Sequence, residues 1–178
     1  MADYKLSISM VPGLLWGENL RKHLTQGQWN RLRAVQFERA PKCEFCNSAP
    51  VGAERHAHEE WVYDARMGIA RLLGLRTTCR MCHFVEHPGF IKVMVANGRF
   101  TPAMFDEIER HFCAVNGCDA KAYRRHCAQA QRRYDKLMQV PAWTVDFGPF
   151  AHLTRSRCLP SPSQQSAFMR PKIAPPSA

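Results

Sequence analysis

Residues 79–87 read CRMCHFVEH and combine the two side chains, cysteine and histidine, that bind transition metals most often. Cys79 and Cys82 are separated by two residues, and Cys43 and Cys46 repeat the same spacing upstream. Two such pairs supply four thiolates, which complete the tetrahedral ligand set of a structural zinc ion. We therefore expect these four cysteines to bind one Zn²⁺, with a substantial segment inserted between the pairs.

Four histidines lie in or beside this segment. His56 and His58 flank Ala57, so in a strand both would project from the same face. His83 and His87 are four residues apart and would share one face of a helix. The four histidines indicate either a second, catalytic metal site with open coordination positions or a histidine base beside such a site.

These residues resemble a branch of the HNH nuclease family, also called the ββα-metal or His-Me finger family. The pattern that carries the resemblance reads Cys43/Cys46, HEEWVYD at 58–64, Gly74-Leu75, Cys79/Cys82-His83 and His87-Pro88-Gly89. The stretches VPGLLWGENLR (11–21), HFCAVNGCD (111–119) and AWTVDFG (142–148) also look similar to this largely uncharacterised bacterial and phage branch. The resemblance extends over residues 8–150.

The resemblance implies an α+β fold with a zinc-stapled ββα-metal core: two short antiparallel strands and a helix, tied together by the cysteine zinc. It implies that His58, on the first strand, is the general base that activates water. It also implies that His83 binds a catalytic divalent cation, Mg²⁺ or another metal, which neutralises charge on the phosphate. His87 and His56 are further candidate ligands of this cation.

The function we expect is that of an HNH-like, metal-dependent endonuclease that hydrolyses DNA phosphodiester bonds. The alternative is a non-catalytic zinc module that binds nucleic acid or a protein, as a factor of a phage or mobile element. Two departures from the family pattern favour this alternative. Ala57 stands where the family often has a metal-binding Asp or His. The central Asn that the family pattern has a few residues before the second CxxC pair is also missing, since no Asn occurs between Ser48 and Ala96.

The flanking sequence predicts α-helices. From about Trp16 to Ala40 the pattern is helical with a break near Gly27, and Trp29, Leu32 and Gln36 share one face. A second helix is expected to open at Thr101-Pro102 and to end at Gly117. Its apolar stripe is Phe105, Ile108, Phe112 and Val115. A third helix starts near Asp119, with a buried seam expected at Tyr123, Cys127, Ala130, Tyr134 and Leu137.

The charge balance favours a polyanionic partner. The formal net charge is +10, and the third helix carries a row of basic residues outside its apolar seam. This basic face either is simply solvated or contacts the phosphates of DNA. Its residues are Arg124, Arg125, Arg132, Arg133 and Lys136.

The length of 178 residues suits one compact domain with four regions. These are a lead-in and helix (1–42), the zinc core (43–98), a basic helical region (99–158) and a flexible Pro/Ser-rich tail (159–178) that could dock on a protein partner. The N-terminus lacks the charged-then-apolar order of a secretory signal, and no run reaches the length of a membrane span. We therefore expect a cytoplasmic protein with reduced cysteines and no membrane partner. Cys113, Cys118, Cys127, His111 and His126 could form another metal site, but we expect them to serve in ordinary packing.

Overall fold

The computed structural model describes residues 4–154, which form an α+β fold around a three-stranded sheet. Strands β1 (Arg55–Asp64) and β2 (Ile69–Cys79) pair as a long antiparallel hairpin, and β3 (Thr144–Asp146) pairs in parallel with the start of β2. The strand order β1-β2-β3 leaves β1 at an edge of the sheet. The predicted tail, 159–178, lies outside the described residues.

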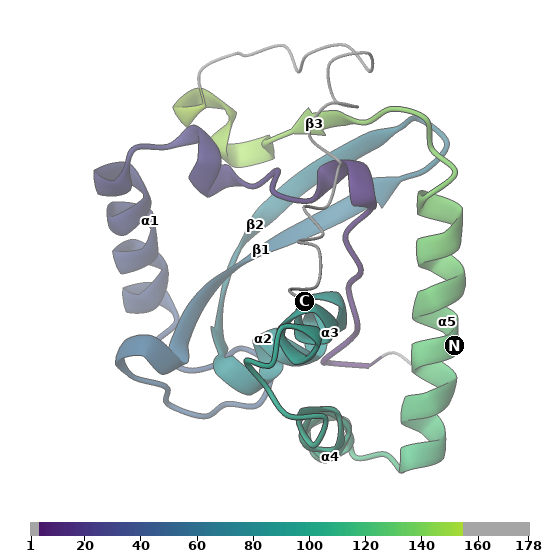
Figure 1. Ribbon diagram of the computed structural model, residues 1–178. Coiled ribbons are helices and arrows are strands. Elements are labelled where there is room, and N and C mark those ends of the chain that lie inside the picture. Colours follow the sequence, from purple (N-terminus) through teal and green to yellow (C-terminus); the bar gives the residue numbers. More distant parts are fainter. Residues whose placement is uncertain (1–3, 155–178) are drawn as a thin grey trace, which may run out of the picture.

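Helices surround the hairpin, and Figure 1 shows α1 and α5 on opposite sides of the molecule with the hairpin between them. The α-helices are α1 (Gln26–Arg39), α2 (Arg80–Glu86), α3 (Pro88–Ala96), α4 (Met104–Asn116) and α5 (Ala120–Leu137). Short 3-10 helices lie at Gly13–Leu15, Leu20–His23, Gly52–Glu54 and Gly148–Leu153.

Helix α1 covers one face of the hairpin. Thr25 caps it through a reciprocal bond with Gln28, so the helix begins at Gln26 and the predicted break falls just before Gly27. Trp29 and Gln36 are buried, as their predicted common face requires. Leu20, Leu72 and Leu75 join Trp29 in an apolar cluster, against which Ala57 of β1 packs. Because side chains alternate along a strand, His56 and His58 project from the other face of β1.

Helix α2 follows β2 without a connecting loop, since Cys79 is both the last residue of β2 and the N-cap of α2. Its Sγ atom accepts a hydrogen bond from the Cys82 amide at 3.5 Å. The helix ends at Glu86 because His87 precedes Pro88, whose ring disfavours helical geometry at the residue before it. A hairpin that runs directly into a helix therefore carries all four of the predicted site histidines.

Helix α4 has the predicted stripe but a later start. Ile108 and Phe112 are buried, and Gly117 ends the helix with a left-handed backbone, as expected. The predicted opening at Thr101-Pro102 is two residues too early. The carbonyls of Thr101 and Pro102 accept amides only three residues ahead, so a tight turn precedes the helix, which begins at Met104 with no side-chain cap.

Helix α5 starts as predicted, because Asp119 caps it by accepting the Ala122 amide at 2.7 Å. Its buried line differs from the predicted seam and consists of Ala122, His126 and Ala130. Of the predicted seam only Ala130 is fully buried. His126 turns inward because its ring packs on Tyr4 and Phe112, and its Nε2 atom accepts the Ile8 amide at 3.0 Å.

The N-terminal segment lies between the hairpin-helix unit and the two C-terminal helices (Figure 1). Leu6 exchanges two backbone hydrogen bonds with the Asn116 side chain at the end of α4. Ser9 donates its amide to the Glu86 carbonyl of α2 at 3.0 Å. The lead-in thus connects α4 and α5 to the helix that bears the histidines.

Candidate metal centres

The four cysteines of the two CxxC pairs form one cluster. Their Sγ atoms all lie within 4.8 Å of one another, and those of Cys46 and Cys79 are 3.6 Å apart. Cys43 and Cys82 are buried, whereas Cys46 and Cys79 are partly exposed. The cluster has the donor type, number and spacing of a structural zinc site, as the sequence predicts.

Local backbone geometry presents these thiols to a common point. Cys43 and Cys46 lie in a tight turn in which the Cys43 carbonyl accepts the Asn47 amide at 2.9 Å. Asn47 adopts a left-handed conformation, with φ of 62°, which reverses the chain after the second cysteine. The other pair starts α2. The turn and the helix start approach each other where the Glu44 amide donates to the Thr77 carbonyl of β2 at 2.9 Å.

Neighbouring thiols shift the pKa values of Cys79 and Cys82 in opposite directions. Hydrogen bonds from Cys43 and Cys82 lower the pKa of Cys79. Hydrogen bonds with Cys43 and Cys79, together with burial, raise the pKa of Cys82. Four thiolates confined to so small a volume repel one another, so full ionisation requires a bound cation. A divalent ion that prefers sulfur ligands meets this requirement.

His111 contacts the same cluster from α4. Its Nε2 atom lies 3.1 Å from Sγ of Cys82, within hydrogen-bonding distance. The sequence interpretation placed His111 among ordinary packing residues, and it did not foresee this contact. No spacing rule links a residue on α4 to a cysteine 29 positions earlier, because only the packing of α4 on α2 brings them together.

Three of the predicted site histidines form a second cluster. His58 of β1, His83 of α2 and His87 at the end of α2 each offer a ring nitrogen, and these atoms lie within 4.8 Å of one another. His58 is only 6% exposed. The alternation of β1 and the four-residue spacing of α2 bring the three rings to one point, as the two periodicities predict.

The orientation of His58 is fixed from both sides. Its Nε2 atom lies 3.1 Å from Oε1 of Glu86, and its Nδ1 atom lies 3.3 Å from Nε2 of His87. Glu86 is itself buried, and its second carboxylate oxygen has no partner among the described residues. The carboxylate therefore holds Nε2 as the protonated nitrogen and leaves Nδ1 facing the other histidines.

His56 stands beside this cluster. Its ring stacks on His83 with a centroid separation of 4.8 Å and an interplanar angle of 16°. The Nε2 atom of His56 is buried and has no hydrogen-bond partner among the described residues. His56 is therefore adjacent to the three clustered histidines, but its ring nitrogens are not part of the set that converges.

Burial favours the uncharged form of His83, His87 and His56 by lowering the pKa of each. It lowers the pKa of His83 to about 3 and that of His87 well below its usual value, with the charges of neighbouring histidines adding to the effect. Burial also lowers the pKa of His56. Metal ligands must be neutral imidazoles, so at neutral pH His83 and His87 are already in the form that binds a cation.

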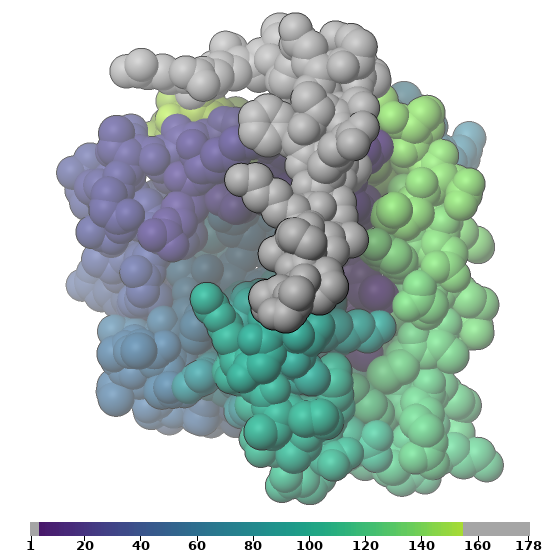
Figure 2. Space-filling view, in the orientation of Figure 1, coloured from purple at the N-terminus to yellow at the C-terminus, as the bar shows by residue number. Residues whose placement is uncertain are grey.

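The predicted basic face lies on α5, on the opposite side of the hairpin from α1 (Figure 1). Arg124, Arg125, Arg132 and Lys136 are exposed. Arg133 is exposed as well, but its Nη2 atom also donates to the Ile8 carbonyl at 3.4 Å and so helps to hold the N-terminal segment. Figure 2 shows the green surface of α5 along one side of the molecule, opposite the purple surface of the N-terminal residues and α1.

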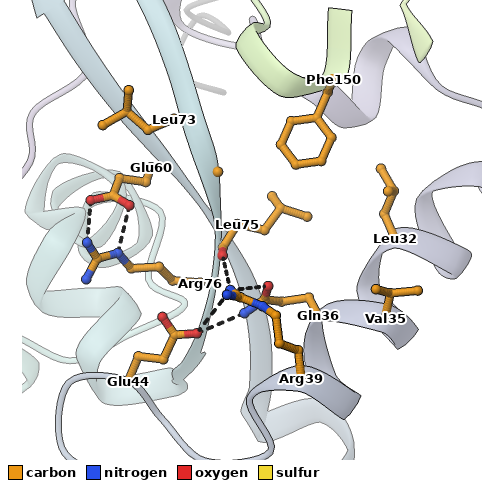
Figure 3. Close-up of a pocket in the computed structure, with 11 residues that line it drawn as sticks. Leu32, Val35, Gln36, Arg39, Glu44, Glu60, Leu73, Leu75, Arg76 and Phe150 are labelled. Atoms are coloured by element: carbon orange, nitrogen blue, oxygen red, sulfur yellow. Dashed lines mark hydrogen bonds and ion pairs between the residues drawn. The ribbon is translucent and has the colours of Figure 1, made fainter. Parts of the chain in front are cut away.

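A cavity of about 580 Å³ lies between α1 and β2 (Figure 3), and it reaches Glu44 of the turn that carries Cys43 and Cys46. Its charged side chains are paired: Arg76 contacts Glu60 at 2.9 Å, and Arg39 lies 3.8 Å from Glu44. It contains none of the predicted site residues. The chemistry of the described residues is therefore concentrated at the cysteine and histidine clusters.

Comparison of the chain with protein-family models, with curated proteins and with solved structures gave no match. Over residues 4–154, every helix is too short or too polar to cross a membrane. The two clusters and their surroundings are thus the observations from which function is inferred.

Proposed function

We propose that this protein is an HNH-like nuclease that uses a divalent metal to hydrolyse phosphodiester bonds of DNA. The order of hairpin and helix, with the cysteine cluster at their junction, supports the ββα-metal core implied by the sequence resemblance. In this proposal the cysteine cluster holds a structural zinc and the histidine cluster is the reaction centre.

The observation that carries the proposal is the orientation of His58. Because Glu86 engages Nε2, the Nδ1 atom is the nitrogen that faces His87 and the centre of the cluster. A general base needs one ring nitrogen that can face the water it deprotonates, and Nδ1, which contacts only His87 here, is the nitrogen that Glu86 leaves for this role. The Glu86 carboxylate also stabilises the imidazolium that forms when His58 accepts a proton.

His83 and His87 are the residues proposed to hold the reactive cation, and the coordination positions that they do not fill would be available to water and a phosphate oxygen. A cation held there would neutralise charge that builds on the phosphate during hydrolysis. Imidazole donors suit zinc, nickel and other transition metals better than Mg²⁺, which prefers oxygen. We therefore expect a transition metal to support activity better than Mg²⁺.

A non-catalytic zinc module is the second candidate. The 6% exposure of His58 favours it, because a base must reach a water beside the substrate. In that case His58, His83 and His87 together bind a second structural metal, with Glu86 orienting His58.

Cleavage assays on purified protein distinguish the two. Single- and double-stranded DNA is incubated with Mg²⁺, Mn²⁺, Ni²⁺, Co²⁺ or Zn²⁺ and the wild type, His58→Ala or His83→Ala, with His152→Ala as the control at an exposed histidine. We expect cleavage by wild type and control. His58→Ala should bind metal at the histidine cluster but not cut, whereas His83→Ala should lose that metal.

Metal binding in the same samples is measured by calorimetric titration. Absence of cleavage by the wild type across all metals and both substrates would reject the nuclease in favour of the module. If His58→Ala lost metal as completely as His83→Ala, His58 would be a ligand rather than the base.

A further inference from the structure

A second group of basic residues, distinct from the basic face of α5, lies at the open end of the hairpin. Arg55 begins β1, and Arg33 lies on α1, which packs against this end. The guanidinium carbons of both lie over the ring of Phe37, at 4.3 Å for Arg55 and 5.4 Å for Arg33. One aromatic ring thus holds two cations in place.

The two arginines of this pair line an open cavity and form no ion pair with an acidic residue among the described residues. A cavity of about 530 Å³ is lined by Asn30, Arg33, Ala34, Phe37, Glu38 and Arg55. The Nε atom of Arg55 is buried and has no hydrogen-bond acceptor within residues 4–154. A buried guanidinium donor without a partner is unfavourable, so the site is suited to an anion that supplies one.

The pair is a neighbour of the predicted site histidines along β1, on the opposite face of the strand. Arg55 immediately precedes His56, and the two point to opposite faces of β1, which is the edge strand of the sheet. Arg80 opens α2 next to Cys79, the residue that pairs with Arg55 across the hairpin. The charges of Arg80 and Arg33 both act on the His56 ring, after burial and Glu54. Cations therefore flank the end of β1 on both of its faces.

We propose that Arg33 and Arg55, stacked on Phe37, bind a phosphate of the nucleic-acid backbone next to the one held at the histidine cluster. This inference rests on the proposed function and names where that site holds its substrate. A nucleic-acid strand carries one charge about every 3.4 Å along the axis, so a strand passing the edge of β1 meets both places. Guanidinium groups match phosphate oxygens through paired N–H donors.

The pair serves a different purpose from the α5 face. It is partly buried and fixed by an aromatic ring, whereas the α5 residues Arg124, Arg125, Arg132 and Lys136 are exposed. Fixed donors lose little conformational freedom on binding and so define the position of the phosphate. Figure 1 places α1 and α5 on opposite sides of the hairpin, so the two surfaces can be tested separately.

The test measures binding without chemistry. Fluorescence anisotropy of labelled single- and double-stranded DNA is recorded without added divalent metal, over a range of salt concentrations. The variant is Arg33→Gln/Arg55→Gln. The control, Arg31→Gln/Arg66→Gln, removes the same charge from two exposed arginines of α1 and the hairpin turn. Zinc content and thermal melting of each protein verify the fold.

We expect the variant to raise Kd roughly tenfold. We also expect it to reduce the slope of log K against log salt by about 0.7 on single-stranded and about 0.9 on double-stranded DNA, the values for one phosphate that is no longer neutralised. The control should keep the slope. Glu38→Gln, which removes the one acidic group of the cavity lining, should tighten binding. Excess inorganic phosphate should not displace the DNA, because a free ion occupies only one of the positions that the strand occupies.

The outcomes separate this inference from the proposed function. An unchanged Kd and slope for the double variant, or an equal loss of affinity in the control, would overturn the arginine site even if the wild type cuts DNA. Displacement by inorganic phosphate would show a site for free anions and would overturn it as well. Arginine-dependent binding by a wild type that cuts nothing would leave the site standing while the nuclease fails.

Discussion

The Nε2 atom of His111 lies 3.1 Å from the Sγ atom of Cys82, which joins α4 to the cysteine cluster. A ring N–H at this distance donates to a thiolate and holds it in position for a metal. We expect His111→Ala to weaken zinc binding by roughly 10- to 100-fold, the range for removal of a hydrogen-bond partner of a metal ligand. Competition with a chromogenic chelator measures the change, and His152→Ala, at an exposed histidine, should leave the affinity unaltered.

Zinc should be required for folding. We expect purified protein to hold one tightly bound zinc ion, and Cys43→Ser or Cys82→Ser to yield insoluble or protease-sensitive chains, because the site does not exist in the unfolded state. Elemental analysis measures the zinc content, and limited proteolysis measures how well each variant is folded. Cys127→Ser on α5 is the control and should keep both the zinc and the fold. A stable, metal-free protein with four free thiols at these positions would contradict the prediction.

Glu86 should matter for cleavage more than for metal content. Glu86→Gln keeps the size of the side chain but removes the charge that stabilises a protonated His58. We expect cleavage at saturating metal to fall at least about tenfold, since general-base catalysis contributes roughly 10²–10⁴-fold. Titration of metal into the histidine cluster should give nearly the wild-type affinity. A full rate in this variant would mean that Glu86 only fills space.

The buried histidines should make stability depend on pH. Burial lowers the pKa of His83 to about 3 from 6.5, so below about pH 6.5 the unfolded chain binds a proton that the folded chain excludes. The free energy of unfolding therefore falls as pH decreases, by up to about 1.4 kcal/mol per pH unit for this histidine. The free energy of unfolding, measured with urea from about pH 7 to 5.5, should change less steeply with pH in His83→Gln than in the wild type.

The difference between the wild type and His83→Gln gives the contribution of His83 to the pH dependence of stability. Burial raises the pKa of Glu86 and Glu59, which opposes the effect of the histidines over part of the same range. Both carboxyls and the cysteine cluster are present in wild type and variant, so their contributions cancel in the difference. Equal slopes would show that His83 titrates in the folded protein as it does in the unfolded chain.

The basic face of α5 should bind the DNA backbone without reading its sequence. Replacing Arg124, Arg125, Arg132 and Lys136 with Gln leaves Arg133 in its contact with the Ile8 carbonyl, so the N-terminal segment stays anchored. We expect weaker binding to all duplexes. The slope of log K against log salt concentration should also fall by about 0.9 for each phosphate that the variant no longer neutralises. Binding is measured by fluorescence anisotropy. A variant with the parental Kd and slope would identify the face as merely solvated.

Local spacing was sufficient to predict the cysteine cluster. A CxxC pair places two thiols within reach of one ion whatever surrounds it, so two pairs predict a four-thiolate site directly. The same holds for His83 and His87, which one turn of helix aligns, and for Gly117, whose left-handed backbone ends α4. These features depend on a few neighbouring residues, and sequence contains that information.

Interactions between distant segments could not be predicted in this way. Glu86 meets His58, His111 meets Cys82, and Arg55 shares the Phe37 ring with Arg33 only because the helices pack on a hairpin of defined register. The buried line of α5 also differs from its predicted seam, because His126 accepts the Ile8 amide in the interior. Sequence by itself determined which residues can bind metal. The tertiary structure decided which partners orient them, because side chains far apart in the chain interact only after the apolar faces have packed.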